Sequence, residues 1–168
     1  MPKSKKTTPK KTAAKPVDVR AEIQSAAEEL LEKLDILSVV TVEPQEENIY
    51  KATVQAEESG LLIGFHGETL SSFQLILGLM VYKRLGSWVR VIVEVGDYRA
   101  KREEQLRGMA ESYAAQAITS GQSVYLPFLP PIERRIIHIA LQDRPDVETL
   151  SEGEGRNRRL VIKPKAAP

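Results

Sequence analysis

Apolar side chains recur at two different spacings in the first half of the chain. In residues 19–34 they stand three or four positions apart, which predicts a helix with one apolar face, capped by Asp18. Residues 36–43 are rich in β-branched side chains and residues 49–56 alternate apolar with polar positions, so both predict strands. Residues 44–48 between them are polar and predict a turn, so we expect a helix followed by an antiparallel hairpin. The apolar face of the helix comprises Val19, Ile23, Ala26, Ala27, Leu30 and Leu34.

The middle of the chain predicts a long helix that is apolar on nearly every side. It begins after Gly67, ends near Leu85 and is closed by Gly86, and a short helical turn precedes Gly64. A helix of this kind is usually buried on several sides; the alternative is that part of its apolar surface meets another subunit. Valines at every second position of residues 88–95 then predict a third strand.

The second half of the chain predicts another unit of mixed helix and strand. A helix opens at Tyr98 and ends at Gly121, a strand follows over residues 123–127, and two prolines ending at Pro131 start another helix. We expect the buried stripe of that helix to be Ile132, Ile136, Ile139 and Ala140. Two strands and the Gly-rich loop that joins them complete the unit, and these segments are residues 146–151, 159–164 and 152–157.

The overall composition bounds the size and the class of the protein. The chain has 168 residues with 42% hydrophobic side chains, enough for one domain or two small ones with packed cores. It contains no Cys and two His, so we expect no disulfide, no thiolate catalysis and no metal site. No apolar run reaches the length of about 18 residues that spans a membrane, and the N-terminus lacks the apolar stretch of a signal peptide. We therefore expect a cytoplasmic protein that does not enter a membrane.

Charge is distributed unevenly along the chain. Residues 1–20 carry seven basic residues and one acidic residue, whereas the remainder carries 17 basic and 22 acidic residues. Residues 1–17 are rich in Lys, Thr, Pro and Ala, and this composition predicts a disordered tail. Such a tail either makes the protein more soluble or attracts a polyanion such as RNA without reading its sequence.

The first candidate for a binding site is the loop Gly64, Phe65, His66 and Gly67, which precedes the long apolar helix. Two Gly residues at this spacing let backbone N–H groups turn outward together at a helix start, where they can hold a nucleic-acid phosphate. His66 either donates a hydrogen bond to phosphate or is an exposed loop residue without a role. Phe65 either stacks on a base or anchors the loop.

A second candidate site lies on the helix after the two prolines, opposite its predicted buried stripe. Arg134 and His138 stand four residues apart, so they present a guanidinium and an imidazole side by side to one ligand, with Arg135 next to them. The alternative is that Arg134 is a solvated charge and His138 a surface histidine without a ligand. Three further basic residues lie in or beside the Gly-rich loop, where we expect them to hold adjacent phosphates: Arg156, Arg158 and Arg159.

The order of these elements resembles two known domains. Helix, strand, strand, helix, helix and strand, with Gly-x-x-Gly between the two central helices, resembles a type II KH domain over residues 18–96. Residues 62–70 match that family's Ile-Gly-x-x-Gly-x-x-Leu core. The second half resembles the R-three-H domain, named for an Arg-x-x-x-His helix, over residues 97–164, and residues 165–168 form a C-terminal tail. A KH domain followed by an R-three-H domain is similar to the bacterial Jag family, most specifically in residues 123–138.

The resemblance implies an α+β fold of two small domains. The KH domain would have a three-stranded sheet with helices on one face, and the R-three-H domain a small sheet packed on helices. Jag proteins are cytoplasmic RNA-binding proteins, regarded as RNA chaperones or post-transcriptional regulators. Several act with a small single-KH partner and affect cell elongation, cell shape and envelope homeostasis. KH loops usually carry Lys or Arg where this chain has Phe65 and His66, so the loop here lacks a fixed positive charge.

Two functional hypotheses follow from the residues and the resemblance. The leading hypothesis is a single-stranded RNA-binding protein with no enzymatic activity and no cofactor, because no catalytic motif is present and the Gly loop lacks the Lys and Ser or Thr of a nucleotide-binding P-loop. The alternative is a protein-interaction scaffold with a degenerate KH loop, which binds a small KH-domain protein or a second copy of itself rather than RNA. The acidic body favours the scaffold, and the Arg-x-x-x-His motif favours RNA.

Overall fold

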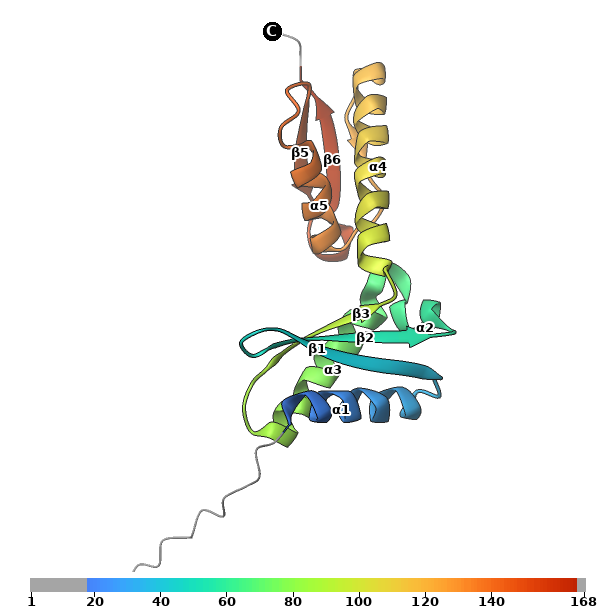
Figure 1. The fold of residues 1–168 in the computed structure, drawn as a ribbon. Helices are drawn as coiled ribbons and strands as arrows, with labels where there is room; N and C mark the ends of the chain where they lie inside the picture. The colour runs from blue at the N-terminus through green and yellow to red at the C-terminus, as the bar shows by residue number, and fades with distance from the viewer. Residues whose placement is uncertain (1–17, 166–168) are drawn as a thin grey trace, which may run out of the picture.

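The computed structural model describes residues 18–165 and shows two α+β units, as the sequence predicted (Figure 1). We call residues 18–96 the first unit and residues 97–165 the second unit. Each contains a three-stranded sheet that packs against helices. The tail predicted as disordered, residues 1–17, and residues 166–168 of the predicted C-terminal tail lie outside the described residues.

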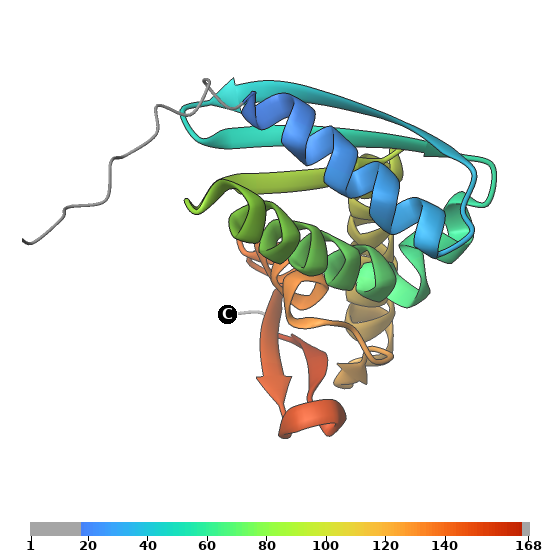
Figure 2. The same cartoon turned by 90° about the horizontal axis from the view of Figure 1, so that it is seen from below.

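The first unit has a sheet in the order β1-β2-β3, with α1 and α3 on one face of it (Figure 2). Strand β2 is central and pairs antiparallel with β1 and parallel with β3, so the predicted hairpin is confirmed. The Asp18 side chain caps α1 as expected, by accepting hydrogen bonds from the backbone N–H groups of Arg20 and Ala21. The elements are α1 (Val19–Lys33), β1 (Ser38–Glu46), β2 (Ile49–Ala56), α2 (Ser59–Ile63), the 3₁₀ turn η1 (Phe65–Gly67), α3 (Glu68–Leu85) and β3 (Arg90–Val95).

The predicted turn over residues 44–48 is wrong in its first half. Strand β1 continues to Glu46, with an irregularity in its pairing between Pro44 and Glu46. Proline has no N–H to donate, and an edge strand such as β1 tolerates it at a bulge. The chain then reverses at Asn48, whose φ of 59° is typical of a tight hairpin turn.

Helix α3 is buried on one side and exposed on the other, so the expectation of burial on several sides holds in part, and contact of its outer surface with another subunit stays a prediction. Its inner side packs in the core with α1 and the inward side chains of the sheet. Its outer side exposes Leu75, Ile76, Leu79 and Tyr82, and Trp88 is exposed beside them. On α1 the core position is Leu31 rather than the predicted Leu34, which is about half exposed. The buried residues of α3 are Leu70, Phe73, Leu77, Gly78 and Val81.

The second unit has a sheet in the order β4-β6-β5, with both pairs of strands antiparallel. Helices α4 and α5 pack on this sheet, and α4 supplies a row of small side chains at Ala110, Ala114 and Ala117. The strand predicted over residues 123–127 is shorter than expected and contains two residues. The elements are α4 (Tyr98–Ser120), β4 (Val124–Tyr125), α5 (Pro131–Leu141), β5 (Val147–Glu152), the 3₁₀ turn η2 (Gly155–Asn157) and β6 (Arg159–Pro164).

The predicted buried stripe of α5 is wrong in part: Ile136 and Ala140 are partly buried and pack against the core, but Ile132 and Ile139 do not. Ile132 is 73% exposed and Ile139 is 45% exposed, whereas the buried side chains are Glu133, Ile137 and Leu141. These three lie at i, i+4 and i+8, so the helical period was right and its phase was shifted by one residue. The shift arises because the buried stripe includes a carboxylate, which a pattern of apolar residues does not count.

The long helix α4 joins the two units. Tyr98, in its first turn, packs against the core of the first unit, and Leu106, two turns later, belongs to the core of the second. The two cores share no residue within the described part of the chain. In the same part of the chain, no helix is long and apolar enough to cross a membrane, and no group of three or more His, Cys, Asp or Glu side chains is arranged to hold a metal ion.

Candidate nucleic-acid interface

The Gly64–Gly67 loop has a backbone that requires glycine at its first position. Gly64 has φ 69° and ψ −170°, and a Cβ atom placed on it would lie 2.0 Å from the Thr69 Oγ1 atom. Gly67 has φ 78° and is the N-cap of α3, with the Tyr98 ring against it. Inside the loop, the Gly67 N–H donates to the Gly64 carbonyl and the Glu68 N–H donates to the Phe65 carbonyl.

The two side chains between the glycines point to different surroundings. Phe65 is 68% exposed, and its ring lies edge-on to the His66 ring with 4.1 Å between ring centres. His66 has φ 52°, which is uncommon for a residue other than Gly, and its side chain is 17% exposed. The expectation of an exposed histidine at this position is therefore wrong, whereas Phe65 is open to solvent and to a ligand.

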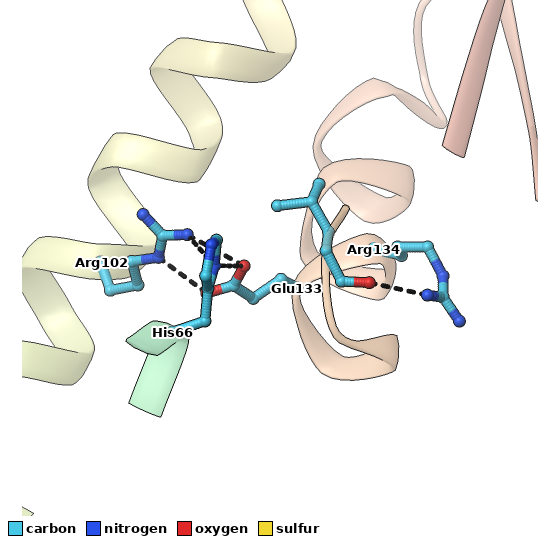
Figure 3. A network of polar contacts seen from close by, with 5 residues as sticks. His66, Arg102, Glu133 and Arg134 are labelled. Atoms are coloured by element: carbon cyan, nitrogen blue, oxygen red, sulfur yellow. Dashed lines mark hydrogen bonds and ion pairs between the residues drawn. The ribbon is translucent and has the colours of Figure 1, made fainter. Parts of the chain in front are cut away.

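The His66 ring turns toward the second unit, where it contacts Glu133 of α5 and Arg102 of α4 (Figure 3). His66 Nδ1 lies 2.7 Å from Glu133 Oε2. Arg102 donates from Nε to Glu133 Oε1 at 2.7 Å and from Nη2 to Glu133 Oε2 at 3.0 Å, and its Nη2 also lies 2.5 Å from His66 Nδ1. We call these three side chains the interdomain triad.

The triad keeps a buried carboxylate ionised. Burial raises the pKa of Glu133, but the hydrogen bonds and charges of Arg102 and His66 outweigh it, so the pKa lies below its ordinary value of 4.5. The hydrogen bond to Glu133 raises the pKa of Arg102 above its usual range. Glu133 therefore carries a full negative charge at neutral pH, and the positive charge of Arg102 is neutralised by it.

The second candidate site forms a cavity between α5 and the β5–β6 hairpin. The cavity holds about 390 Å³. It brings Arg134, Arg135 and His138 of α5 together with Arg158, which precedes β6, although Arg158 stands twenty residues after His138 in the chain. Thr149 of β5 also lines the cavity.

Two of these side chains are held in place by neighbours. Arg134 donates from Nη1 to the Leu129 carbonyl at 2.7 Å, and Figure 3 shows it pointing away from the triad, on the other side of the start of α5. His138 Nδ1 and Thr149 Oγ1 share a hydrogen bond of 2.5 Å, which leaves Nε2 as the ring nitrogen for a ligand. Burial and then the charges of Arg158 and Arg159 lower the pKa of Arg134, so positive charge is concentrated here.

The other two basic residues of the predicted site, Arg156 and Arg159, flank Arg158 in the chain and do not line this cavity. Arg159 donates from Nη1 to the Arg156 carbonyl at 2.8 Å, and its guanidinium lies 5.4 Å from the centre of the Phe128 ring, in a cation–π contact. Within residues 18–165, five arginines of this cluster form no ion pair with a carboxylate. We call these five residues the arginine cluster: Arg134, Arg135, Arg156, Arg158 and Arg159.

A larger cavity lies between the units, beside the triad. It holds about 590 Å³ and is lined by the start of α3, the first half of α4 and the start of α5. The exposed Ile132 is part of its wall. The sequence interpretation missed Arg102, Glu133 and Thr149, and for Glu133 the one available signal was its helical spacing of four residues from the apolar Ile137.

Comparison with known proteins gives the family of the chain. Residues 20–95 match the KH domain of KhpA and KhpB, and residues 104–164 match the R-three-H domain. The chain is 35% identical to RNA-binding protein KhpB of Clostridium symbiosum, over 89% of this chain and 71% of the relative. It is 34% identical to RNA-binding protein KhpB of Bacillus subtilis (strain 168), over 85% of this chain and 67% of the relative. With RNA-binding protein KhpB of Lactiplantibacillus plantarum the identity is 37%, over 62% of this chain and a third (33%) of the relative. The chain therefore belongs to the KhpB family, which is the Jag family that the order of its two domains predicted.

Proposed function

We propose that this protein binds single-stranded RNA, with the arginine cluster as its main contact surface. The observation that carries the proposal is the set of five arginines without carboxylate partners in residues 18–165, of which Arg134, Arg135 and Arg158 line one cavity with His138. Unpaired guanidinium groups attract phosphate strongly and donate to its oxygens in pairs. The names of the relatives, RNA-binding protein KhpB, support the same ligand.

The arrangement of the cluster favours a flexible strand over a duplex. Arg134 is preorganised by the Leu129 carbonyl, so little side-chain freedom is lost when it meets a phosphate. His138 Nε2 and the Arg158 guanidinium line the same cavity and can contact neighbouring groups of one strand. A duplex presents a rigid groove, whereas a single strand can bend its backbone into a small cavity.

The loop of the first unit adds contacts of a different kind. Phe65 is exposed at the tip of the loop and can stack on an unpaired base. The N–H groups of Gly64 and Gly67 donate to backbone carbonyls, so the start of α3 contributes the positive end of its helix dipole to a phosphate at this loop. The His66 ring is turned toward Glu133, so we expect it to hold the loop in place and not to contact RNA itself.

The biological role we propose follows the family. The protein acts in the cytoplasm as an RNA chaperone or post-transcriptional regulator, without an enzymatic step, and it contributes to cell elongation and envelope homeostasis. This role rests on the resemblance and on family membership, and it depends on RNA binding.

The test is a binding titration with fluorescently labelled single-stranded RNA at several salt concentrations. We expect affinity to fall steeply with salt, with a slope of about −0.7 per phosphate contacted. Arg158→Gln removes one phosphate contact and leaves the fold intact, because Arg158 is exposed. It should therefore reduce both the affinity and the slope. Wild-type protein that binds neither RNA strands nor duplexes would refute the proposal.

A second candidate function is the scaffold, and the exposed side of α3 favours it. Three large apolar side chains of the first unit are more than half exposed: Leu75 (62%), Leu79 (52%) and Trp88 (59%). Such a group is unusual on a surface that contacts only water. A second copy of the chain or a small KH-domain protein would cover it. Two measurements separate the two functions, namely RNA affinity and the molecular mass from light scattering. The scaffold function predicts a complex with a protein partner and no RNA binding.

A further inference from the structure

The interdomain triad places a buried charge where two separate cores meet. Of the polar and charged residues in the described part of the chain, Glu133 alone is buried, with 5% of its surface exposed. A buried carboxylate costs free energy unless it is paired and hydrogen-bonded on all sides. Here the fork of Arg102 and the ring of His66 supply three donors. Arg102 lies in the same unit as Glu133, whereas His66 belongs to the first unit, so the third donor is present only when the two units are docked as they are in this structure.

The three side chains come from three elements that carry or flank the candidate RNA contacts. His66 lies inside the Gly64–Gly67 loop of the first unit, and Glu133 immediately precedes Arg134 on α5 (Figure 3). Arg102 lies on α4, the helix that joins the units. Within residues 18–165, the hydrogen bond between His66 and Glu133 is the one that joins the first unit to α5. The relative position of the two candidate RNA contacts therefore depends on this carboxylate.

We propose that the His66–Arg102–Glu133 triad is an interdomain latch, which holds the Gly64–Gly67 loop and the arginine cluster in one fixed geometry so that a single RNA strand binds both. Glu133 is then a positioning residue that acts through His66 and Arg102 and does not touch RNA. The part of the proposal that concerns RNA rests on the proposed function, whereas the latch itself does not.

Local geometry supports a rigid connection at this point. A Cβ atom on Gly67 would lie 3.2 Å from the Tyr98 ring, so the loop packs closely against the first turn of α4. His66 is held at a positive φ of 52°, a backbone conformation that a free loop has no reason to keep for a non-glycine residue. In this conformation the His66 ring reaches Glu133 and Arg102 of the second unit.

The first experiment measures the latch without RNA. Backbone ¹⁵N relaxation of the full chain gives a rotational correlation time for each unit, and we expect one shared value for the wild type. Glu133→Gln removes the charge and keeps the size of the side chain, and we expect two different, shorter correlation times. Equal correlation times in wild type and Glu133→Gln would overturn the latch.

Two further variants keep this experiment decisive. Glu111→Gln is the matched control. Glu111 also forms an ion pair with an arginine, Arg144, but both residues lie within the second unit. This variant should therefore leave the shared correlation time unchanged. His66→Asn removes the member of the triad that belongs to the first unit. Asn tolerates the positive φ of this position, so the loop backbone can keep its conformation. If Glu133→Gln unfolds the second unit, His66→Asn gives the same test with that unit intact.

The second experiment measures the coupling of the two RNA contacts. Affinities are compared for an oligonucleotide of about four nucleotides, which reaches one contact, and one of about 15 nucleotides, which can reach both. Glu133→Gln should leave the affinity for the short oligonucleotide unchanged. It should lower the affinity for the long oligonucleotide roughly tenfold, because the two units no longer hold the second contact in a fixed position. The coupling would be overturned if the ratio of the affinity for the long oligonucleotide to that for the short one is the same in Glu133→Gln as in the wild type, or if the affinity rises for both lengths. If the wild type binds neither oligonucleotide, the proposed function fails together with the coupling, while the relaxation data still decide the latch.

Discussion

Two isoleucines on one helix provide a direct test of the corrected phase of α5. Ile137 is fully buried in the core of the second unit, whereas Ile132, on the same helix, is 73% exposed. The two positions share residue type and helix, and although Ile132 lies in the first turn, the helix-propensity difference between Ile and Ala is below about 1 kcal/mol and small beside the effect of burial. The difference between them therefore isolates burial.

The expected magnitudes follow from that burial. Replacing a buried Ile with Ala removes apolar contact and leaves a cavity, which costs about 2–5 kcal/mol, and Ile137→Val should cost about 0.5–1.5 kcal/mol. Ile132→Ala should change the free energy of unfolding by less than about 0.5 kcal/mol, because water already covers most of that side chain. For a unit of this size, each kcal/mol corresponds to roughly 4–8 °C in melting temperature.

Urea denaturation followed by far-UV circular dichroism measures these changes on the full chain. The single tryptophan, Trp88, lies in the first unit and reports the unfolding of that unit by fluorescence in the same samples. Ile137→Ala should shift the circular dichroism transition to lower urea and leave the Trp88 transition nearly unchanged. Equal losses for Ile132→Ala and Ile137→Ala, or a larger loss for Ile132→Ala, would refute the placement of Glu133, Ile137 and Leu141 in the core.

Three other predictions concern the sites. Arg134→Ala and His138→Ala should each weaken single-strand RNA binding by about 1–3 kcal/mol in a fluorescence titration, and the double variant should lose less than the sum because both contact the same strand; additive losses would place them on separate contacts. Because the pKa of Glu133 in the folded protein lies below its ordinary value of 4.5, its stabilising contribution is present above that pH and is lost as the pH falls through the lowered pKa. The difference in melting temperature between wild type and Glu133→Gln should therefore shrink from pH 7 to pH 3, and a difference that stays constant contradicts the ionised triad. Light scattering of the wild type, alone and with a small KH-domain protein, should give a mass above the 18.7 kDa monomer, and Leu79→Glu on the exposed side of α3 should restore the monomer; a wild type that is strictly monomeric with every such partner argues against a docking face.

Elements whose signals are local in the sequence were predictable. The alternation in residues 49–56 gave the bounds of β2 correctly, and the glycines that close α3 and α4, Gly86 and Gly121, both adopt the left-handed conformation expected at a helix end. Asp18 caps α1 as its side-chain chemistry predicts. Each of these features depends on a few residues that are neighbours in the chain, so it can be predicted from the sequence alone.

Features that depend on distant residues were not predictable in the same way. The phase of α5 was misjudged because Glu133 looks like a surface residue until Arg102 and His66, 31 and 67 positions away in the chain, are placed beside it. The grouping of Arg134 with Arg158 needs the pairing of β5 with β6, which brings the residues before β6 back to α5. In both cases the residue types were visible in the sequence, and the partner that gives them their role was not.

The triad also changes the interpretation of the loop that lacks Lys and Arg. A cation does lie beside His66, namely Arg102, but both oxygens of Glu133 accept hydrogen bonds from it, so the loop gains little net positive charge. Phosphate at the loop must then depend on backbone N–H groups and the helix dipole, which are weaker attractors than a free guanidinium. In the second unit, by contrast, Arg134, Arg135 and Arg158 of the arginine cluster form no ion pair in the described chain and line a cavity. We therefore expect the arginine cluster to provide most of the salt-dependent affinity, and the loop, with Phe65 exposed and His66 held by Glu133, to provide stacking and orientation.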